Sequence, residues 1–126
     1  MLSHEKWLLK ARNDLEAAKI LYQANCLDVA IYHTQQCAEK ALKGYLALQK
    51  QPIVKTHDLA ALVAHCEKFE PVFSHINLLA EKLTPFSVAF RYPEAEIYPK
   101  KQVVLSAVRD AEKILLFVET RINKSA

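Results

Sequence analysis

The stretch that decides the fold is LDVAIYHTQQCAEKALKGYLALQK, residues 27–50. Its small and apolar residues recur every three or four positions, which is the spacing of an α-helix. They form two adjacent stripes: Ala30, His33, Cys37, Ala41, Gly44 and Leu48, and Leu27, Ile31, Thr34, Ala38, Leu42 and Tyr45. A helix with two such stripes packs neighbours on two sides. We therefore expect it at the centre of a bundle, with a third, solvated face: Asp28, Tyr32, Gln35, Glu39 and Lys43.

The composition indicates one globular domain spanning residues 1–126, with 52% hydrophobic residues and 25% charged residues. A single glycine argues against phosphate-cradling glycine loops and against a turn-rich β fold. No apolar run reaches the roughly 20 residues that span a bilayer, and three cysteines without CxxC spacing suggest reduced, buried thiols. We expect a cytoplasmic protein with no membrane association, metal or cofactor. A net charge of +3 permits a nucleic-acid partner without indicating one.

The rest of the chain predicts an all-α, antiparallel up-and-down bundle of four to five helices. The first helix should run from Ser3, as N-cap, to Gln23, and the short turn at 24–26 makes it antiparallel to the second. Thr56 is the expected N-cap of the third helix. Pro71 suits the first position of a fourth, and the last should cover residues 101–122.

Between the fourth and last helices lies the irregular segment TPFSVAFRYPEAEIYPK, residues 84–100. Its prolines disfavour helix, but its aromatic residues argue against a loose linker, and long packed loops are often functional. Arg91 stands among these aromatics. It suits the binding of phosphate through its planar guanidinium, or, alternatively, an ion pair with Glu96 that fixes the loop.

Three polar residues project from one edge of the central helix: His33, Gln36 and Lys40. They could form a ledge for a phosphate or a base, but a lone histidine on an apolar stripe is more simply explained as a core histidine beside the first helix. His57 could act as a base at the start of the third helix, but capping by its neighbours Thr56 and Asp58 accounts for that position without chemistry.

Read together, these residues resemble the HEPN family of small all-helical domains. The resemblance covers nearly the whole chain and is carried by four motifs. They are Trp7, Ala11 and Asp14-Leu15; Asp28 and Ala30 leading to the run from His33 to Lys43; Thr56-His57-Asp58-Leu59; and Arg91-Tyr92-Pro93.

The resemblance implies a bundle of four to five helices, commonly a homodimer, which often pairs with a minimal nucleotidyltransferase in a toxin–antitoxin-like system. Many members are metal-independent ribonucleases with an arginine, four to six residues and then a histidine. In the toxin branch a tyrosine two residues later receives AMP from the partner enzyme. Here Arg91 fills the arginine position and Tyr98 the tyrosine position, but Glu96 replaces the histidine.

Two functions follow from this resemblance. The first is a catalytically silent, homodimeric module that binds nucleotide or RNA through Arg91, Lys40, His33, Gln36 and Tyr98. The alternative is a divergent ribonuclease toxin in which Arg91 holds phosphate and Glu96, or a histidine such as His33 or His57, transfers the proton. A purely structural subunit is a third possibility. The apolar residues of the irregular segment, together with the last helix, are expected to form the dimer contact.

Overall fold

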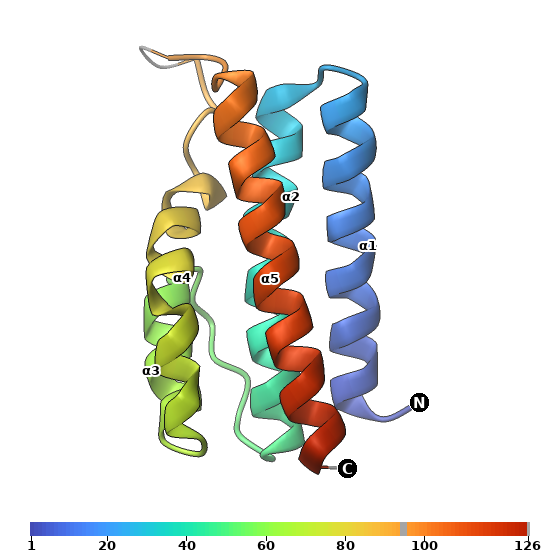
Figure 1. Cartoon of the computed structure of the whole chain (residues 1–126), viewed down its shortest axis with the longest axis vertical. Helices are drawn as coiled ribbons and strands as arrows, with labels where there is room; N and C mark the ends of the chain where they lie inside the picture. Colours follow the sequence, from blue (N-terminus) through green and yellow to red (C-terminus); the bar gives the residue numbers. More distant parts are fainter. Residues whose placement is uncertain (94–95, 126) are drawn as a thin grey trace.

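The computed structural model describes residues 1–93 and 96–125, and within them it contains five α-helices, two short 3₁₀ helices and no strand (Figure 1). This confirms the predicted all-α bundle. The α-helices are α1 (Ser3–Gln23), α2 (Leu27–Leu48), α3 (Leu59–Glu67), α4 (Asn77–Leu83) and α5 (Lys101–Ser125). The 3₁₀ helices η1 (Pro71–Ile76) and η2 (Thr84–Ser87) flank α4, so the predicted fourth helix is α-helical only in its second half. The last helix is longer than expected.

The central position predicted for α2 is confirmed, because it contacts α1, α3 and α5 (Figure 1). Its only glycine allows a close crossing with α1. A Cβ atom added to Gly44 would lie 3.1 Å from Cβ of Trp7, tighter than most such contacts. A side chain at position 44 would therefore require Trp7 to shift by a few tenths of an ångström.

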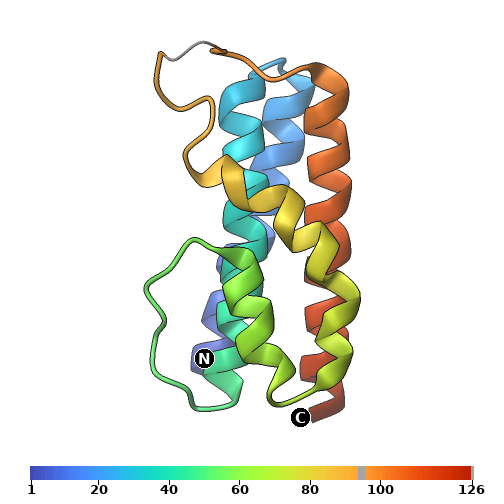
Figure 2. The same cartoon turned by 90° about the vertical axis from the view of Figure 1, so that its left-hand side faces the viewer.

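The connector of residues 49–58 changes the direction of the chain. It leaves the C-terminal end of α2, passes along the outside of the bundle and returns to its middle, so α3 runs in the same direction as α2 (Figure 2). Val54, which is partly buried, packs against the hydrophobic core from this connector. The connector thus covers part of α2 that would otherwise face water.

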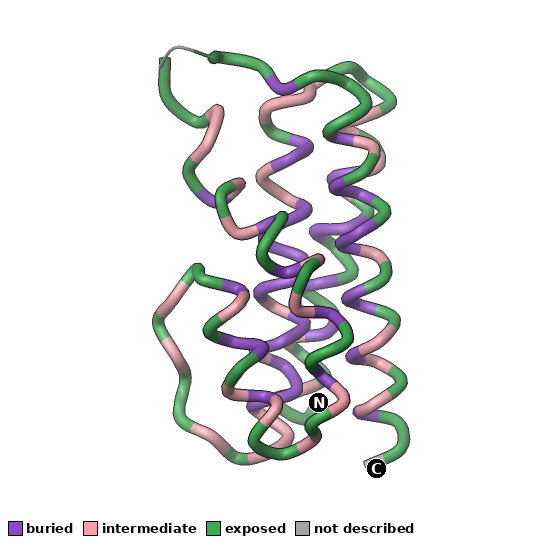
Figure 3. Tube along the Cα trace, turned by 60° about the vertical axis from the view of Figure 1, so that its left-hand side comes forward, coloured by how far each residue is buried: buried purple, intermediate pink, exposed green. Residues whose placement is uncertain are grey.

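The prediction of a solvated third face of α2 is wrong for Gln35 and Glu39, which are buried, whereas Asp28, Tyr32 and Lys43 are half-buried. Gln35 is 0% exposed and Glu39 is 5% exposed, while the buried positions of the molecule follow the inward faces of all the long helices (Figure 3). The connector is irregular, so it has no hydrophobic period from which its burial of α2 could be predicted. Buried polar groups must then find partners inside the protein.

Both predicted N-caps are one or two residues from the observed ones. Leu2, not Ser3, occupies the N-cap position of α1 and makes no side-chain hydrogen bond there. Asp58, not Thr56, caps α3 by accepting hydrogen bonds from the backbone N–H groups of Ala60 and Ala61. The Thr56 hydroxyl accepts one from the Asp58 N–H, so it supports the cap rather than forming it.

The irregular segment lies against the bundle through Phe86 and Phe90, both partly buried against the core. Phe90 has a φ angle of 66°, in the left-handed region that aromatic residues rarely adopt. No helix within residues 1–93 and 96–125 is long and apolar enough to cross a membrane.

Candidate functional site

A buried carboxylate on α1 joins that helix to α2. Asp14 is 7% exposed; its Oδ1 lies 2.7 Å from Nδ1 of His33, and its Oδ2 accepts a 2.6 Å hydrogen bond from Nζ of Lys40. We call these three residues the Asp14 cluster. The sequence singled out Asp14 only within the motif of the first helix, together with Trp7, Ala11 and Leu15. The structure shows that it positions two of the three residues of the predicted ledge.

A second buried carboxylate, on α2 itself, binds the connector. Oε1 of Glu39 lies 2.7 Å from Nδ1 of His57, and Oε2 accepts a 3.0 Å hydrogen bond from Lys43. The amide nitrogen of Gln35 donates both to Glu39 Oε1 and to the backbone carbonyl of His57. We call these four residues the Glu39 cluster.

The charge on Glu39 is stabilised by these contacts. Burial raises the pKa of the carboxyl, but the hydrogen bonds from His57, Lys43 and Gln35, with the charge of Lys43, outweigh burial and hold the pKa below its ordinary value of 4.5. The carboxylate therefore stays ionised at neutral pH and keeps its three partners. This arrangement ties the connector to the centre of the fold.

Arg91 is the residue of the irregular segment that meets α2. Its guanidinium carbon lies 4.3 Å from the centre of the Tyr32 ring, and its Nη1 donates a 3.2 Å hydrogen bond to the backbone carbonyl of Ser87. The Tyr32 ring in turn meets the His33 ring edge to face, with 5.5 Å between centroids. The predicted alternative, an ion pair with Glu96, is not among the ion pairs of the described residues.

These side chains border one surface hollow of about 280 Å³. We call it the Arg91 hollow, and it is lined by Asp28, Val29, Tyr32, His33, Phe90 and Arg91. Its volume is close to the lower limit of roughly 300 Å³ for small-molecule pockets. It offers a cation, an imidazole and aromatic faces together, which suits a phosphate attached to a base or sugar.

The other predicted site residues lie at different distances from this hollow. Lys40 does not line the hollow. Its Nζ donates a hydrogen bond to Asp14, which in turn contacts His33. Gln36 is buried and donates to Gln35 Oε1, so it belongs beside the Glu39 cluster and not on a ledge. Tyr98 lines an adjoining hollow that shares Asp28 and Val29 with the first. Glu96 is exposed and does not line the Arg91 hollow.

Sequence reasoning missed Tyr32, which was assigned to the solvated face, and the role of Asp14. A signal for Tyr32 existed in principle, because it directly precedes His33 on α2 and an aromatic ring is the usual support for an arginine. Its contact with Arg91 joins positions that are far apart in the sequence, through a segment without periodicity. No local pattern encodes such a pair.

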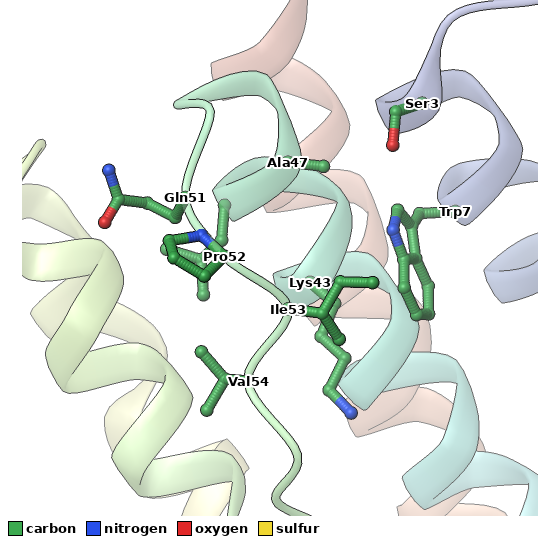
Figure 4. A pocket seen from close by; sticks show the side chains of 9 residues that line it. Ser3, Trp7, Lys43, Ala47, Gln51, Pro52, Ile53 and Val54 are labelled. Carbon is green, nitrogen blue, oxygen red and sulfur yellow. The ribbon is translucent and has the colours of Figure 1, made fainter.

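Another hollow, of about 100 Å³, lies between the N-terminal end of α1, α2 and the connector. Figure 4 shows Trp7 of α1 facing Lys43 of α2 and Ile53 of the connector. At roughly 30 Å³ per water this space holds about three waters, which is too little for a nucleotide. It is best explained as imperfect packing under the connector.

Three further buried side chains, those of Cys37, Cys66 and Tyr45, stay protonated at neutral pH. Burial raises the pKa of the Cys37 thiol, and likewise that of Cys66, from 9.0 to about 12. Burial and the neighbouring Glu70 also raise the pKa of Tyr45. Cys26 is half-buried, and all three cysteines are free thiols. No group of three or more potential metal ligands occurs in the described part of the chain.

Comparison with known families decides what this fold is. The HEPN domain profile matches residues 4–121, nearly the whole chain. The chain belongs to the HEPN family. In this member the Asp14 cluster and the Arg91 hollow bring together residues from three of the four motifs that carried the resemblance.

Three individual proteins are similar to this HEPN chain. The protein named "Putative toxin MJ1304" from Methanocaldococcus jannaschii is 32% identical over 125 residues, covering 86% of this chain and 81% of that protein. The crystal structure of TT1696 from Thermus thermophilus superposes with a TM-score of 0.86 at 28% identity, covering 95% of this chain and 98% of that one. ST0689, described as an archaeal HEPN homologue, superposes with a TM-score of 0.80 at 27% identity, covering 97% and 99%.

Proposed function

We propose that this HEPN module binds a nucleotide or a segment of RNA in the Arg91 hollow. The single observation that carries the proposal is the guanidinium of Arg91, which stacks on Tyr32 beside His33 and uses one nitrogen on a backbone carbonyl. Its other N–H groups have no partner among the described residues, so they are available to a phosphate. The aromatic faces of the hollow suit the attached base.

We also propose that Arg91 and Glu96 do not act together as a catalytic acid–base pair. Glu96 is exposed and stands outside the hollow. A carboxylate at that position would also repel the phosphate of the ligand. Binding at Arg91 needs no contribution from Glu96.

We further propose that the module is a homodimer and pairs with a minimal nucleotidyltransferase, in a toxin–antitoxin-like system. Support for the dimer comes from apolar side chains that this chain leaves in water. They lie in the irregular segment and on α5: Val88, Ile97, Val103 and Leu116. Support for the system comes from the toxin name of the M. jannaschii relative. Sedimentation as a monomer at micromolar concentration would contradict the dimer, and failure to co-purify with the nucleotidyltransferase would contradict the pairing.

Binding is tested by fluorescence anisotropy with a labelled single-stranded RNA, and by competition with AMP and GTP. We expect Arg91→Ala to weaken RNA binding about tenfold, because a charge-assisted hydrogen bond contributes on the order of 1.5–3 kcal/mol. The matched control is Arg109→Ala, an exposed arginine on α5 outside the hollow.

Each outcome of this test has a definite meaning. Competition by a mononucleotide as strong as that by RNA would identify a nucleotide site, and preference for the oligomer an RNA site. Equal weakening in the two arginine variants would mean that net charge alone binds RNA, and the assignment of the hollow would be wrong. The same holds if the wild-type protein binds neither RNA nor mononucleotide.

A further inference from the structure

A pocket of about 320 Å³ opens between α4 and η2 on one side and α5 on the other. The helices α4 and α5 lie side by side (Figure 2). Four apolar residues line the pocket: Leu83, Phe86, Val103 and Ala107. We call it the Asp110 pocket, after the carboxylate that also lines it. Apolar walls with a few polar groups, and a volume above roughly 300 Å³, are typical of small-molecule sites.

Asp110 is the least well paired of the buried carboxylates in the described part of the chain. It is 5% exposed. Asp14 and Glu39 each have polar partners on both oxygens. Oδ2 of Asp110 lies 2.9 Å from Nζ of Lys82, but not in hydrogen-bonding geometry, and no described residue donates a hydrogen bond to it. Burial of a carboxylate is costly unless hydrogen bonds replace those to water, so the pocket contains an acceptor that a ligand could satisfy.

Lys82 is a loosely held partner for this carboxylate. Its side chain is 57% exposed. An ammonium that stays more than half in water gains little from such an ion pair, so another cation can replace it at small cost. The exchange substitutes one cation for another, and Asp110 is not left as an unpaired buried charge. Lys82 also shows which chemistry the position accepts, namely a primary ammonium on an apolar stem.

We propose that the Asp110 pocket binds a small organic amine with an apolar body. The protonated amine replaces Nζ of Lys82 and donates hydrogen bonds to the Asp110 carboxylate, which are strong because both groups are charged. The aryl or alkyl body lies against Phe86 and Val103, where it removes apolar surface from water. Lys82 turns outward into solvent. No covalent bond forms or breaks.

This site is separate from the Arg91 hollow and does not depend on the proposed binding of nucleotide or RNA. The two cavities share no lining residue. Phe86 of the pocket and Phe90 of the hollow have their ring centroids 6.4 Å apart, so the cavities are neighbours. Substitutions at Asp110 should therefore leave RNA affinity within about twofold of the wild type, which anisotropy titrations measure.

The test is isothermal titration calorimetry at pH 7 with 2-phenylethylamine and with hexylamine. Both are protonated there, because alkylammonium groups like that of lysine have a pKa of about 10.4. Two matched compounds separate the contributions. The first, 2-phenylethanol, has the aromatic body without the charge, and ethylamine has the charge with little apolar body. We expect each to bind at least about tenfold more weakly than 2-phenylethylamine, since each lacks one of the two interactions.

A substitution at the carboxylate tests the contact with the amine. Asp110→Asn should weaken binding of 2-phenylethylamine at least about tenfold, because a charge-assisted hydrogen bond is lost, and should leave binding of 2-phenylethanol within about twofold. The matched control is Glu112→Gln. Glu112 is another ion-paired carboxylate of α5, bound to Lys19 and outside the pocket. This variant should bind the amine like the wild type.

The replacement of Lys82 gives a prediction of opposite sign. Lys82→Met should strengthen amine binding about two- to fivefold, because the ligand no longer competes with the resident ammonium. Lys19→Met removes the same charge elsewhere on the surface and should have no effect. Ser106 is exposed and lines the pocket. Ser106→Trp should fill the pocket and abolish binding, and it tests the site even if Asp110→Asn does not fold, as circular dichroism would show.

Several results would overturn the inference. Failure of the wild type to bind either amine removes the site, and equal binding of 2-phenylethanol and 2-phenylethylamine denies the role of the carboxylate. Unchanged or weaker amine binding in Lys82→Met would mean that the ligand does not take the place of that ammonium. Dissociation of a dimer by the amine, seen by sedimentation, would identify the pocket as a contact between two copies of the chain. None of these results affects RNA binding at the Arg91 hollow, which the anisotropy assay reports separately.

Discussion

The Asp14 cluster and the Glu39 cluster are built from the same parts. Each has a buried carboxylate, a histidine held through Nδ1 at 2.7 Å and a lysine on the second oxygen. They differ in their surroundings. The histidine of the first opens onto a hollow with an arginine, and the histidine of the second is attached to the connector over α2.

This difference shows that a carboxylate bound to a histidine and a lysine does not by itself define a functional site. In the Glu39 cluster the hydrogen bonds tie the connector to α2, because Gln35 also donates to the backbone carbonyl of His57. In the Asp14 cluster Nε2 of His33 is left for a ligand. We therefore expect changes in the Glu39 cluster to affect stability, and changes around the Asp14 cluster to affect ligand binding.

The largest effect should come from Glu39→Ala. The substitution leaves Lys43, His57 and the fully buried Gln35 without their shared acceptor. Removing one partner of a buried ion pair costs about 3–5 kcal/mol, so the free energy of unfolding should fall by about 3 kcal/mol in urea titrations. RNA affinity at low temperature, where the variant is folded, should stay within about twofold. Weakened affinity in that folded protein would break the distinction between the clusters.

A pH titration should sharpen the distinction. The folded pKa of Glu39 is held below 4.5, so its ionised form adds stability above pH 4.5, and that contribution declines as pH falls through the lower folded pKa. The stability advantage of wild type over Glu39→Gln should therefore be constant near neutrality and shrink below pH 4.5. It is measured by denaturation across pH 3–7. An advantage that grows on acidification would show that the carboxylate is destabilised by burial.

A smaller effect, on RNA affinity, is expected in the Arg91 hollow at Tyr32, whose ring stacks against the Arg91 guanidinium. Tyr32→Ala should weaken RNA binding several-fold, because a partly exposed cation–π contact contributes about 0.5–1 kcal/mol and also fixes the guanidinium. Tyr32→Phe keeps the ring and should bind RNA like the wild type. Anisotropy titrations measure both, and equal weakening would assign the effect to the hydroxyl.

The smallest expected effect is an increase in RNA affinity. Asp28 places a carboxylate on the rim of the Arg91 hollow, where it opposes a phosphate. Asp28→Asn should strengthen RNA binding about two- to threefold at low salt, and the gain should shrink as salt screens the charge. The same change at Asp58, an exposed residue outside the hollow, is the control for net charge. A loss of affinity would mean that Asp28 accepts a hydrogen bond from the ligand.

The periodic parts of the chain were predictable. The two stripes of α2 fixed its central place, and the short turn after Gln23 fixed its antiparallel pairing with α1. The errors occur where irregular chain covers a helix. Gln35 and Glu39 read as solvated because the connector that buries them carries no periodic signal.

The candidate site was predictable in its members more than in their grouping. Arg91, His33 and Lys40 were singled out by residue type and spacing, yet Lys40 acts through Asp14 and Gln36 belongs to the Glu39 cluster. The pairing of Arg91 with Tyr32 depends on how the segment after η2 folds back onto α2. Such a long-range contact is a tertiary property, which spacing within one helix does not encode.

The different burial of the three cysteines makes site-selective labelling possible. Cys37 and Cys66 are buried, and their pKa values of about 12 keep them as unreactive thiols in the native protein. Cys26 is half-buried and lines the hollow of Tyr98, which shares Asp28 and Val29 with the Arg91 hollow. A thiol-reactive fluorophore should therefore attach there first, at a single place, and report ligand occupancy without any engineered cysteine.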